Sequence, residues 1–309
     1  MRKVSTFILI LLLASGCIPF LNIGIVKAQS IVYITADGTV EGTDKIQRDG
    51  DNYTFTSNIS GAIILDKSGI VIDGNGYTLT GDANNHGIYL NHIKDTIIKN
   101  VRIESCNNGF YLDWASNTTI TENEIQNSSE NGIRVFESRN NTISKNNIDN
   151  NKASGIYLHT YSFLNLIILN NITSNSEYGI NNNQHSSINL IHHNNFIDNG
   201  NQATIYPGEI NGWGWDNGFP SGGNYWSDYN GTDNNGDGIG DTPYIINENN
   251  HDKYPLMIPF DISTSQEFST IPEFPSWNIL PLFLTVTLAA IIIKKRIQTR
   301  SNSQKAFEG

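Results

Sequence analysis

One short phrase recurs at nearly constant spacing through the middle of the chain. It starts with glycine, continues with an apolar residue and a residue of varying type, and usually ends in Leu or Val. Copies begin at Gly87, Gly109, Gly132, Gly155 and Gly179, so the steps are 22, 23, 23 and 24 residues. A copy this short cannot enclose a hydrophobic core of its own. Successive copies must therefore stack and share one core.

Two further apolar columns and one Asn column advance with this phrase. They are Ile98, Ile120, Ile143, Ile167 and Ile191; Ile103, Ile125, Ile148, Ile172 and Phe196; and Asn123, Asn146, Asn170 and Asn194. Each stretch is short, rich in Ile, Thr and Tyr, and bounded by Gly, Asn or Ser, which favours strands and turns. Three strands per copy predict an all-β, right-handed parallel β-helix of about six coils over residues 60–205, with Asn side chains bonded from coil to coil. A leucine-rich repeat would need fixed Leu positions and a helical half, and the sequence has neither.

The pattern Gly-Ile-x-Leu followed by Asn-x-Ile resembles the repeats of the NosD-like and carbohydrate-binding sugar-hydrolase families. The resemblance covers about half of the chain and implies a pectin-lyase-like β-helix. It is specific for the fold and weak for activity. Residues 29–59 are then expected to form a leading cap and 206–262 a trailing module rich in aromatic and acidic residues, since an open coil end exposes strand edges and core. That trailing module is similar to one found in archaeal surface proteins with NosD-like repeats.

Both ends of the chain carry apolar segments. Residues 1–28 have the layout of a cleavable signal peptide, with an uncleaved anchor or a lipid attached to Cys17 as alternatives. Residues 277–293 are apolar, uncharged and followed by Lys294, Lys295 and Arg296, which predicts a membrane-spanning helix with a cytoplasmic tail at 294–309. We therefore expect a single-pass protein anchored at the cell surface. The linker 263–276 and this helix also resemble archaeosortase sorting signals, so whether the helix is kept or cleaved stays open.

The exported part of the chain is strongly acidic. It holds 11 Lys and Arg against 29 Asp and Glu, a net charge of −18. Such a surface makes nucleic acid and anionic lipid poor partners. Cys106 is the one Cys left after removal of the signal peptide, which excludes an intrachain disulfide.

Four side chains of the repeated phrase are candidates for binding a ligand. Tyr89, Tyr111, Arg134 and Tyr157 occupy its third position and should point outward, stacked about 4.8 Å apart on one face. Tyrosines in register with an arginine could lie against sugar rings, as sugar-processing β-helix proteins bind polymers along such faces. The alternative is that Tyr stacking simply stabilises the sheet.

Catalytic residues are harder to assign. Asp113 and His159 follow the same strand two coils apart, about 10 Å, which is too far for an acid and a base that must act on one bond. Glu137 lies in the next position of the intervening coil. These three are weak candidates for a polysaccharide lyase, hydrolase or epimerase. Our first hypothesis is a surface protein that binds or organises glycans without turnover, and convergence of acidic groups near the three residues would favour the enzyme instead.

The trailing module contains the strongest metal signal. Oxygen-bearing residues alternate around a glycine as in the first part of a calcium loop, at Asp233, Asn235, Asp237, Ile239 and Asp241. The usual Glu is replaced by Tyr244, so Asp228 or Asp252 would have to complete the site. The alternative is an acidic turn without an ion.

Copper also has to be considered, because NosD-like proteins are often described as copper-associated. The seven His residues show no alternation, and Met and Cys are scarce. The sequence therefore does not favour a copper site.

Overall fold

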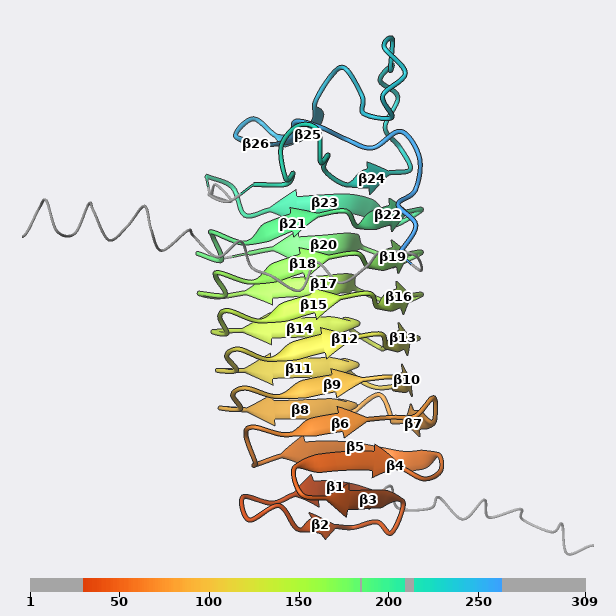
Figure 1. Ribbon diagram of the computed structural model, residues 1–309, viewed down its shortest axis with the longest axis vertical. Coiled ribbons are helices and arrows are strands. Elements are labelled where there is room, and N and C mark those ends of the chain that lie inside the picture. The colour runs from red at the N-terminus through yellow and green to blue at the C-terminus, as the bar shows by residue number, and fades with distance from the viewer. Residues whose placement is uncertain (1–29, 184, 209–213, 263–309) are drawn as a thin grey trace, which may run out of the picture. The chain divides into compact units, whose positions relative to one another are not determined.

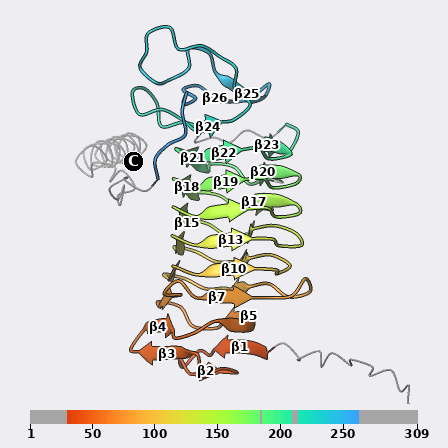
Figure 2. The same ribbon diagram turned by 90° about the vertical axis from the view of Figure 1, so that its right-hand side faces the viewer.

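The computed structural model describes residues 30–183, 185–208 and 214–262, and shows 26 strands and no helix there. Most of the strands form three parallel ladders that wind around one core (Figures 1 and 2). The parallel β-helix predicted from the repeat is thus confirmed, of the right-handed type that parallel crossovers adopt. It has about seven coils where the sequence predicted about six, because the first coil lacks the repeated phrase.

The first ladder contains the repeated phrase. Its strands are β1 (Ser30–Ile34), β5 (Ile59–Leu65), β8 (Ile88–Asn91), β11 (Phe110–Asp113), β14 (Ile133–Phe136), β17 (Ser154–His159), β20 (Tyr178–Asn182) and β23 (Asn201–Ile205). In β8, Ile88 and Leu90 are buried while Tyr89 between them is half-buried on the outer side. The same alternation holds in the next three strands, as expected for one face packed on a core.

The second and third ladders complete each coil. The second consists of β4 (Asn52–Phe55), β6 (Val71–Asp73), β9 (Ile97–Lys99), β12 (Thr119–Thr121), β15 (Thr142–Ser144), β18 (Leu166–Ile168) and β21 (Leu190–His192). The third consists of β7 (Thr78–Thr80), β10 (Arg102–Glu104), β13 (Glu124–Gln126), β16 (Asn147–Asp149), β19 (Asn171–Thr173), β22 (Asn195–Ile197) and β24 (Tyr225–Trp226). The predicted apolar columns lie in exact register along these ladders and are fully buried.

The predicted Asn column forms a continuous buried ladder. The Nδ2 of Asn146 donates to Oδ1 of Asn170 at 3.0 Å, and Asn146 Oδ1 accepts from Asn123 at 3.0 Å. The ladder runs one step further than predicted, into Asn224 of the trailing module. Two more such columns were not predicted: Asn141, Asn165 and Asn189; and Asn151, Asn175 and Asn199. Stacked amides bonded from coil to coil fix the register between coils.

The glycine of the repeated phrase is needed because two coils come very close there. A Cβ on Gly132 would lie 2.5 Å from Ile148 Cγ2 and 2.7 Å from the Gly155 carbonyl oxygen. Gly109 and Gly155 are in the same situation with the coils that follow them. The phrase therefore begins with glycine for packing, independently of any ligand.

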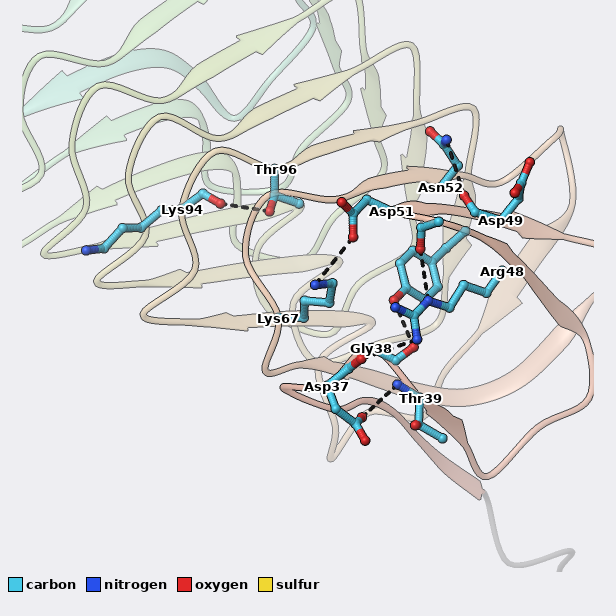
Figure 3. A network of polar contacts seen from close by, with 12 residues as sticks. Asp37, Gly38, Thr39, Arg48, Asp49, Asp51, Asn52, Lys67, Lys94 and Thr96 are labelled. Carbon is cyan, nitrogen blue, oxygen red and sulfur yellow. Dashed lines mark hydrogen bonds and ion pairs between the residues drawn. The ribbon is translucent and has the colours of Figure 1, made fainter.

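The two ends of the stack are closed differently. At the first, β2 (Val40–Glu41) and β3 (Ile46–Asp49) pair antiparallel with β1 and β4, and Arg48 donates to the carbonyl oxygens of Gly50 and Asp37 (Figure 3). At the other, Trp226 stacks on Phe196 of the last coil at 4.5 Å, and a short hairpin of β25 (Tyr244–Asn247) and β26 (Asn250–Asp252) follows. Both closures bury apolar surface that an open coil would expose.

The predicted signal peptide (1–28), the linker (263–276), the spanning helix (277–293) and the tail (294–309) lie outside the described residues. Within the described part of the chain, no helix is long and apolar enough to cross a membrane.

Candidate functional site

The four predicted ligand-binding residues lie side by side on the outer face of the first ladder. Tyr89, Tyr111, Arg134 and Tyr157 are in register across β8, β11, β14 and β17. The Tyr89 and Tyr111 rings stack at 5.3 Å, and the Arg134 guanidinium lies between Tyr111 and Tyr157, at 5.1 and 5.8 Å from their centroids. The ring faces are thus largely used within the column, and such contacts stabilise the sheet. The Nε of Arg134, however, is buried and has no hydrogen-bond partner.

Asp113 and His159 flank this column in the register that the sequence predicts, with Phe136 between them. Asp113 accepts a hydrogen bond from the Tyr89 hydroxyl at 2.8 Å. Burial, and then this hydrogen bond, raise the pKa of Tyr89. His159 stacks on Tyr157 at 4.9 Å and contacts Arg134 at 3.4 Å. Burial and the adjacent Arg134 cation lower the pKa of His159, so it is neutral at neutral pH.

These contacts do not bring an acid and a base onto one point. Asp113 faces Tyr89, a phenol held in its neutral form, and His159 is directed at Arg134. Glu137 is part of the following turn and lines the pocket beside this face. A general acid and a general base must reach the same reacting bond. In this arrangement each candidate residue contacts a different partner.

A pocket next to this face was missed by sequence reasoning. A pocket of about 620 Å³ lies over the turns between the first and second ladders, and we call it the turn groove. Its lining residues are His92, Lys94, Trp114, Ala115, Ser116, Glu137, Arg139, Tyr161 and Phe163. It combines aromatic rings, two cations and one carboxylate, which is the composition of many small-molecule sites.

The backbone of the turns presents these side chains outward. His92, Trp114, Glu137 and Tyr161 each adopt a left-handed conformation, with φ of 58°, 55°, 46° and 50°, directly after the strand or one residue later. The turns then pair in register through single bridges that join Lys94, Ser116, Arg139 and Phe163. Successive coils therefore place one lining residue above another.

Two aromatic rings of the groove are unusually exposed. Trp114 is 53% exposed and stacks on His92, with ring centroids 5.9 Å apart and an interplanar angle of 3°. Tyr161 is 55% exposed and stacks on His185 at 5.3 Å. Each ring is held on one side and open to solvent on the other. The sequence does contain the signal for Trp114, which directly follows a strand of the repeat where the neighbouring coils carry His92 and Glu137.

The predicted calcium loop is held by its own carboxylates. Asp233 accepts backbone N–H groups of Gly236 at 2.7 Å and Gly238 at 2.9 Å, and Asp241 accepts that of Asn234 at 2.9 Å. Among the residues that the structure describes, no three His, Cys, Asp or Glu side chains gather into a metal site. The arrangement of Asn235, Asp237 and Ile239 around Gly236 keeps the loop compact, with Asp237 accepting from the Ile239 amide.

Neither residue expected to complete that loop is directed at it. Asp252 is fully buried and accepts hydrogen bonds from the backbone N–H of Asn224 at 2.7 Å and from Trp226 Nε1 at 2.8 Å. Its burial raises its pKa to about 7. Asp228 accepts from the Tyr244 hydroxyl at 3.2 Å. Asp252 is therefore committed to hydrogen bonds within the trailing module and is not available as a calcium ligand.

The ladders, the Asn columns and the turn groove define a parallel β-helix protein built from short sequence repeats. The sequence model of the NosD family, described as "Periplasmic copper-binding protein (NosD)", matches residues 22–231. The chain belongs to the NosD family. A search of curated protein sequences gives no match.

Solved structures with a similar fold include enzymes that act on polysaccharides. The mannuronan C-5 epimerase AlgE6 A-module of Azotobacter vinelandii is 16% identical, with 48% of this chain and 52% of that chain covered and a TM-score of 0.39. The Agl-KA catalytic domain is 17% identical, with 52% and 38% covered and a TM-score of 0.35. The aligned part thus spans about half of the epimerase module. At these values neither activity is carried over to this chain.

The copper in the family description can be tested against the residues present. His192 and His193 lie at the end of the last coil with their Nδ1 atoms 2.6 Å apart, and His193 Nε2 contacts the Ser221 carbonyl at 2.8 Å. His92 and His185 support aromatic rings of the turn groove, and His159 belongs to the outer face. Copper takes converging imidazole or sulfur ligands, and the described residues do not supply such a set.

Proposed function

We propose that this protein binds glycans outside the cytoplasm, without turning them over, and that the ligand lies in the turn groove. The observation that carries the proposal is the pair of half-exposed rings, Trp114 and Tyr161, each supported on one side and open on the other. The periplasmic description of the NosD family supports the location. The spanning helix predicted at 277–293 would hold the protein at the cell surface.

The chemistry of the groove suits sugar rings. The apolar faces of a sugar pack on aromatic side chains, while its hydroxyl groups need charged or polar partners. Glu137, Arg139 and Lys94 supply such partners beside Trp114. Because coils repeat about every 4.8 Å, a groove that crosses several of them suits an extended chain better than a compact ligand.

The outer face beside the groove extends this surface. Tyr89, Tyr111, Arg134 and Tyr157 are half-buried there. Asp113, Glu137 and His159 do not converge, so the geometry favours binding over a lyase, hydrolase or epimerase reaction. We also propose that calcium, where present, acts at residues 233–241 to stiffen the trailing module.

The test is a glycan panel applied to the purified protein and to single variants. Trp114→Ala should weaken binding of the best ligand at least about tenfold, as loss of a central aromatic anchor does. Trp114→Phe should retain most of the affinity, since it keeps a ring. Tyr206→Ala is the matched control, because Tyr206 is 47% exposed but lies after β23 and outside the groove.

Two outcomes would contradict the proposal. One is that no saccharide binds the wild-type protein. The other is that Trp114→Ala and Tyr206→Ala have equal effects. Product analysis of the same incubations addresses turnover, and cleavage or epimerisation that Asp113→Asn abolishes would show an enzyme.

A further inference from the structure

The turn groove concentrates cations in a protein that is otherwise acidic. The exported part of the chain has a net charge of −18, yet two of its 11 cationic residues, Lys94 and Arg139, line this one pocket. Glu137 is the acidic residue among the lining side chains. Arg134 adds a third cation on the adjoining outer face.

Neither groove cation is neutralised within the described part of the chain. The ion pairs found there involve Lys67, Lys99 and Arg102, each with a carboxylate of another segment. Figure 3 shows the Lys94 ammonium pointing away from the residues drawn, while its main-chain carbonyl accepts a hydrogen bond from Thr96. Lys94 and Arg139 therefore have their charges available in a pocket that also holds open aromatic rings.

The spacing of the two cations is set by the coils. Bridges join Lys94 to Ser116 and Ser116 to Arg139, so the two cationic residues are two coils apart, about 10 Å along the stack. Ser116 between them is small and half-buried, which leaves space over the middle coil. An extended ligand with anionic groups at intervals can reach both.

We propose that the turn groove is specific for acidic glycans, whose carboxylate or sulfate groups bind Lys94 and Arg139 while their rings pack on Trp114 and Tyr161. This inference rests on the proposed function and names its ligand class. Arg139 can bind a carboxylate or sulfate through two parallel N–H groups, and Lys94 acts as a point charge. A neutral glycan would leave both cations without an anionic partner.

The charge distribution distinguishes acidic glycans from nucleic acid. Double-stranded DNA carries one charge per about 1.7 Å of axis and needs many phosphate contacts, which a surface of net charge −18 opposes. Two cations about two coils apart suit a polymer with sparse charges. A sugar ring also offers apolar faces to Trp114, which a phosphate backbone does not.

The experiment compares an oligogalacturonate of defined length with its methyl ester, measured by calorimetry on the full-length protein. The ester keeps the rings and removes the charges. Wild-type protein should bind the acid at least about tenfold more tightly than the ester, and the preference should shrink as salt rises. Lys94→Gln and Arg139→Gln should each reduce affinity for the acid about tenfold and reduce affinity for the ester by a clearly smaller factor, so that the preference for the acid shrinks.

The controls separate the inference from the proposed function. Lys152→Gln removes an exposed cation of another turn and should change nothing. Equal binding of acid and ester, insensitive to Lys94→Gln and Arg139→Gln, would overturn the inference and leave glycan binding intact. Absence of binding to either saccharide, and to a wider neutral panel, would overturn the proposed function itself. Preferential capture of single-stranded DNA through the same two cations would also overturn the inference.

Discussion

The interior of the coils and the turn groove differ in how they use the same repeat. Inside, each coil places Ile or Asn at equivalent positions, and the buried Asn amides are bonded to the coil above and below. In the groove, equivalent turn positions hold His92, Trp114 and Glu137, and the cations there have no ion pair within the described chain. In the interior, the polar side chains of each coil bond to the equivalent side chains of the neighbouring coils. The charged side chains of the groove have no such partners in the described chain.

This contrast separates residues that hold the fold from residues that could bind a ligand. A position that repeats in every coil contributes to stacking, because the same contact must be made at each step. A position that changes from coil to coil makes a local contact that stacking does not require. The outer face with its Tyr residues combines features of both cases. Its side chains repeat and stack on each other, as in the interior, but they lie on the surface, where a ligand could contact them.

The largest expected effect is the loss of stability in an interior Asn variant. In Asn146→Ala, the buried amide that bonds Asn123, Asn170 and the Ile120 carbonyl disappears, which leaves several buried polar groups without partners. We expect a decrease of about 2–4 kcal/mol in the free energy of unfolding, measured by urea denaturation. Asn147→Ala, at the exposed neighbouring position, should change it by less than about 0.5 kcal/mol. Equal decreases in the two variants would contradict the assignment of fold stability to the interior Asn residues.

A second prediction concerns pH at the junction of the last coil with the trailing module. Burial lowers the pKa of His192 to about 3, and it also lowers that of His193. The unfolded chain therefore binds more protons than the folded one between about pH 6.5 and pH 3, and stability falls as the pH decreases through this window. Each proton contributes at most about 1.4 kcal/mol per pH unit.

Asp252 acts with the opposite sign at the same junction. Its raised folded pKa, about 7, means that the folded state binds the extra proton between about pH 4 and pH 7, so its contribution falls as the pH increases. Comparing the pH dependence of the free energy of unfolding of the wild type with that of His192→Leu isolates the contribution of His192. We expect His192→Leu to be less stable at pH 8 but to lose less stability on acidification to pH 4. Parallel profiles of the two proteins would contradict this account.

The smallest expected effect is that of calcium on the trailing module. The loop 233–241 offers hard oxygen ligands but lacks the usual Glu, so we expect an affinity of about 10⁻⁴ to 10⁻³ M. Millimolar calcium should raise the melting temperature by a few degrees at most, and Asp237→Ala should remove the gain while the coils stay folded. A melting temperature indifferent to calcium and chelator would show that Asp233, Asp237 and Asp241 only shape the turn.

The sequence predicted most of the repeating features, apart from the two further Asn columns, and missed the features that do not repeat. The Ile columns and the ladder through Asn146 follow from spacing alone, whereas the first coil, with β1 and β4, carries no copy of the phrase and was left out of the count. The outer face was placed correctly, but the stacking of Arg134 between two rings depends on side-chain conformation. The turn groove was missed because left-handed turns, which no spacing reveals, direct Trp114 and Tyr161 outward.

The central claim is that the interior ladders hold the fold and the turn groove binds the ligand. Hydrogen exchange of the full-length protein, with and without saturating oligogalacturonate, tests it directly. We expect slower exchange on binding at residues 92–94, 114–116, 137–139 and 161–163, and no change in β12, β13, β15 and β16 on the remaining sides of the coils. Protection confined to those ladders, or to the trailing module at 214–262, would contradict the assignment of the site.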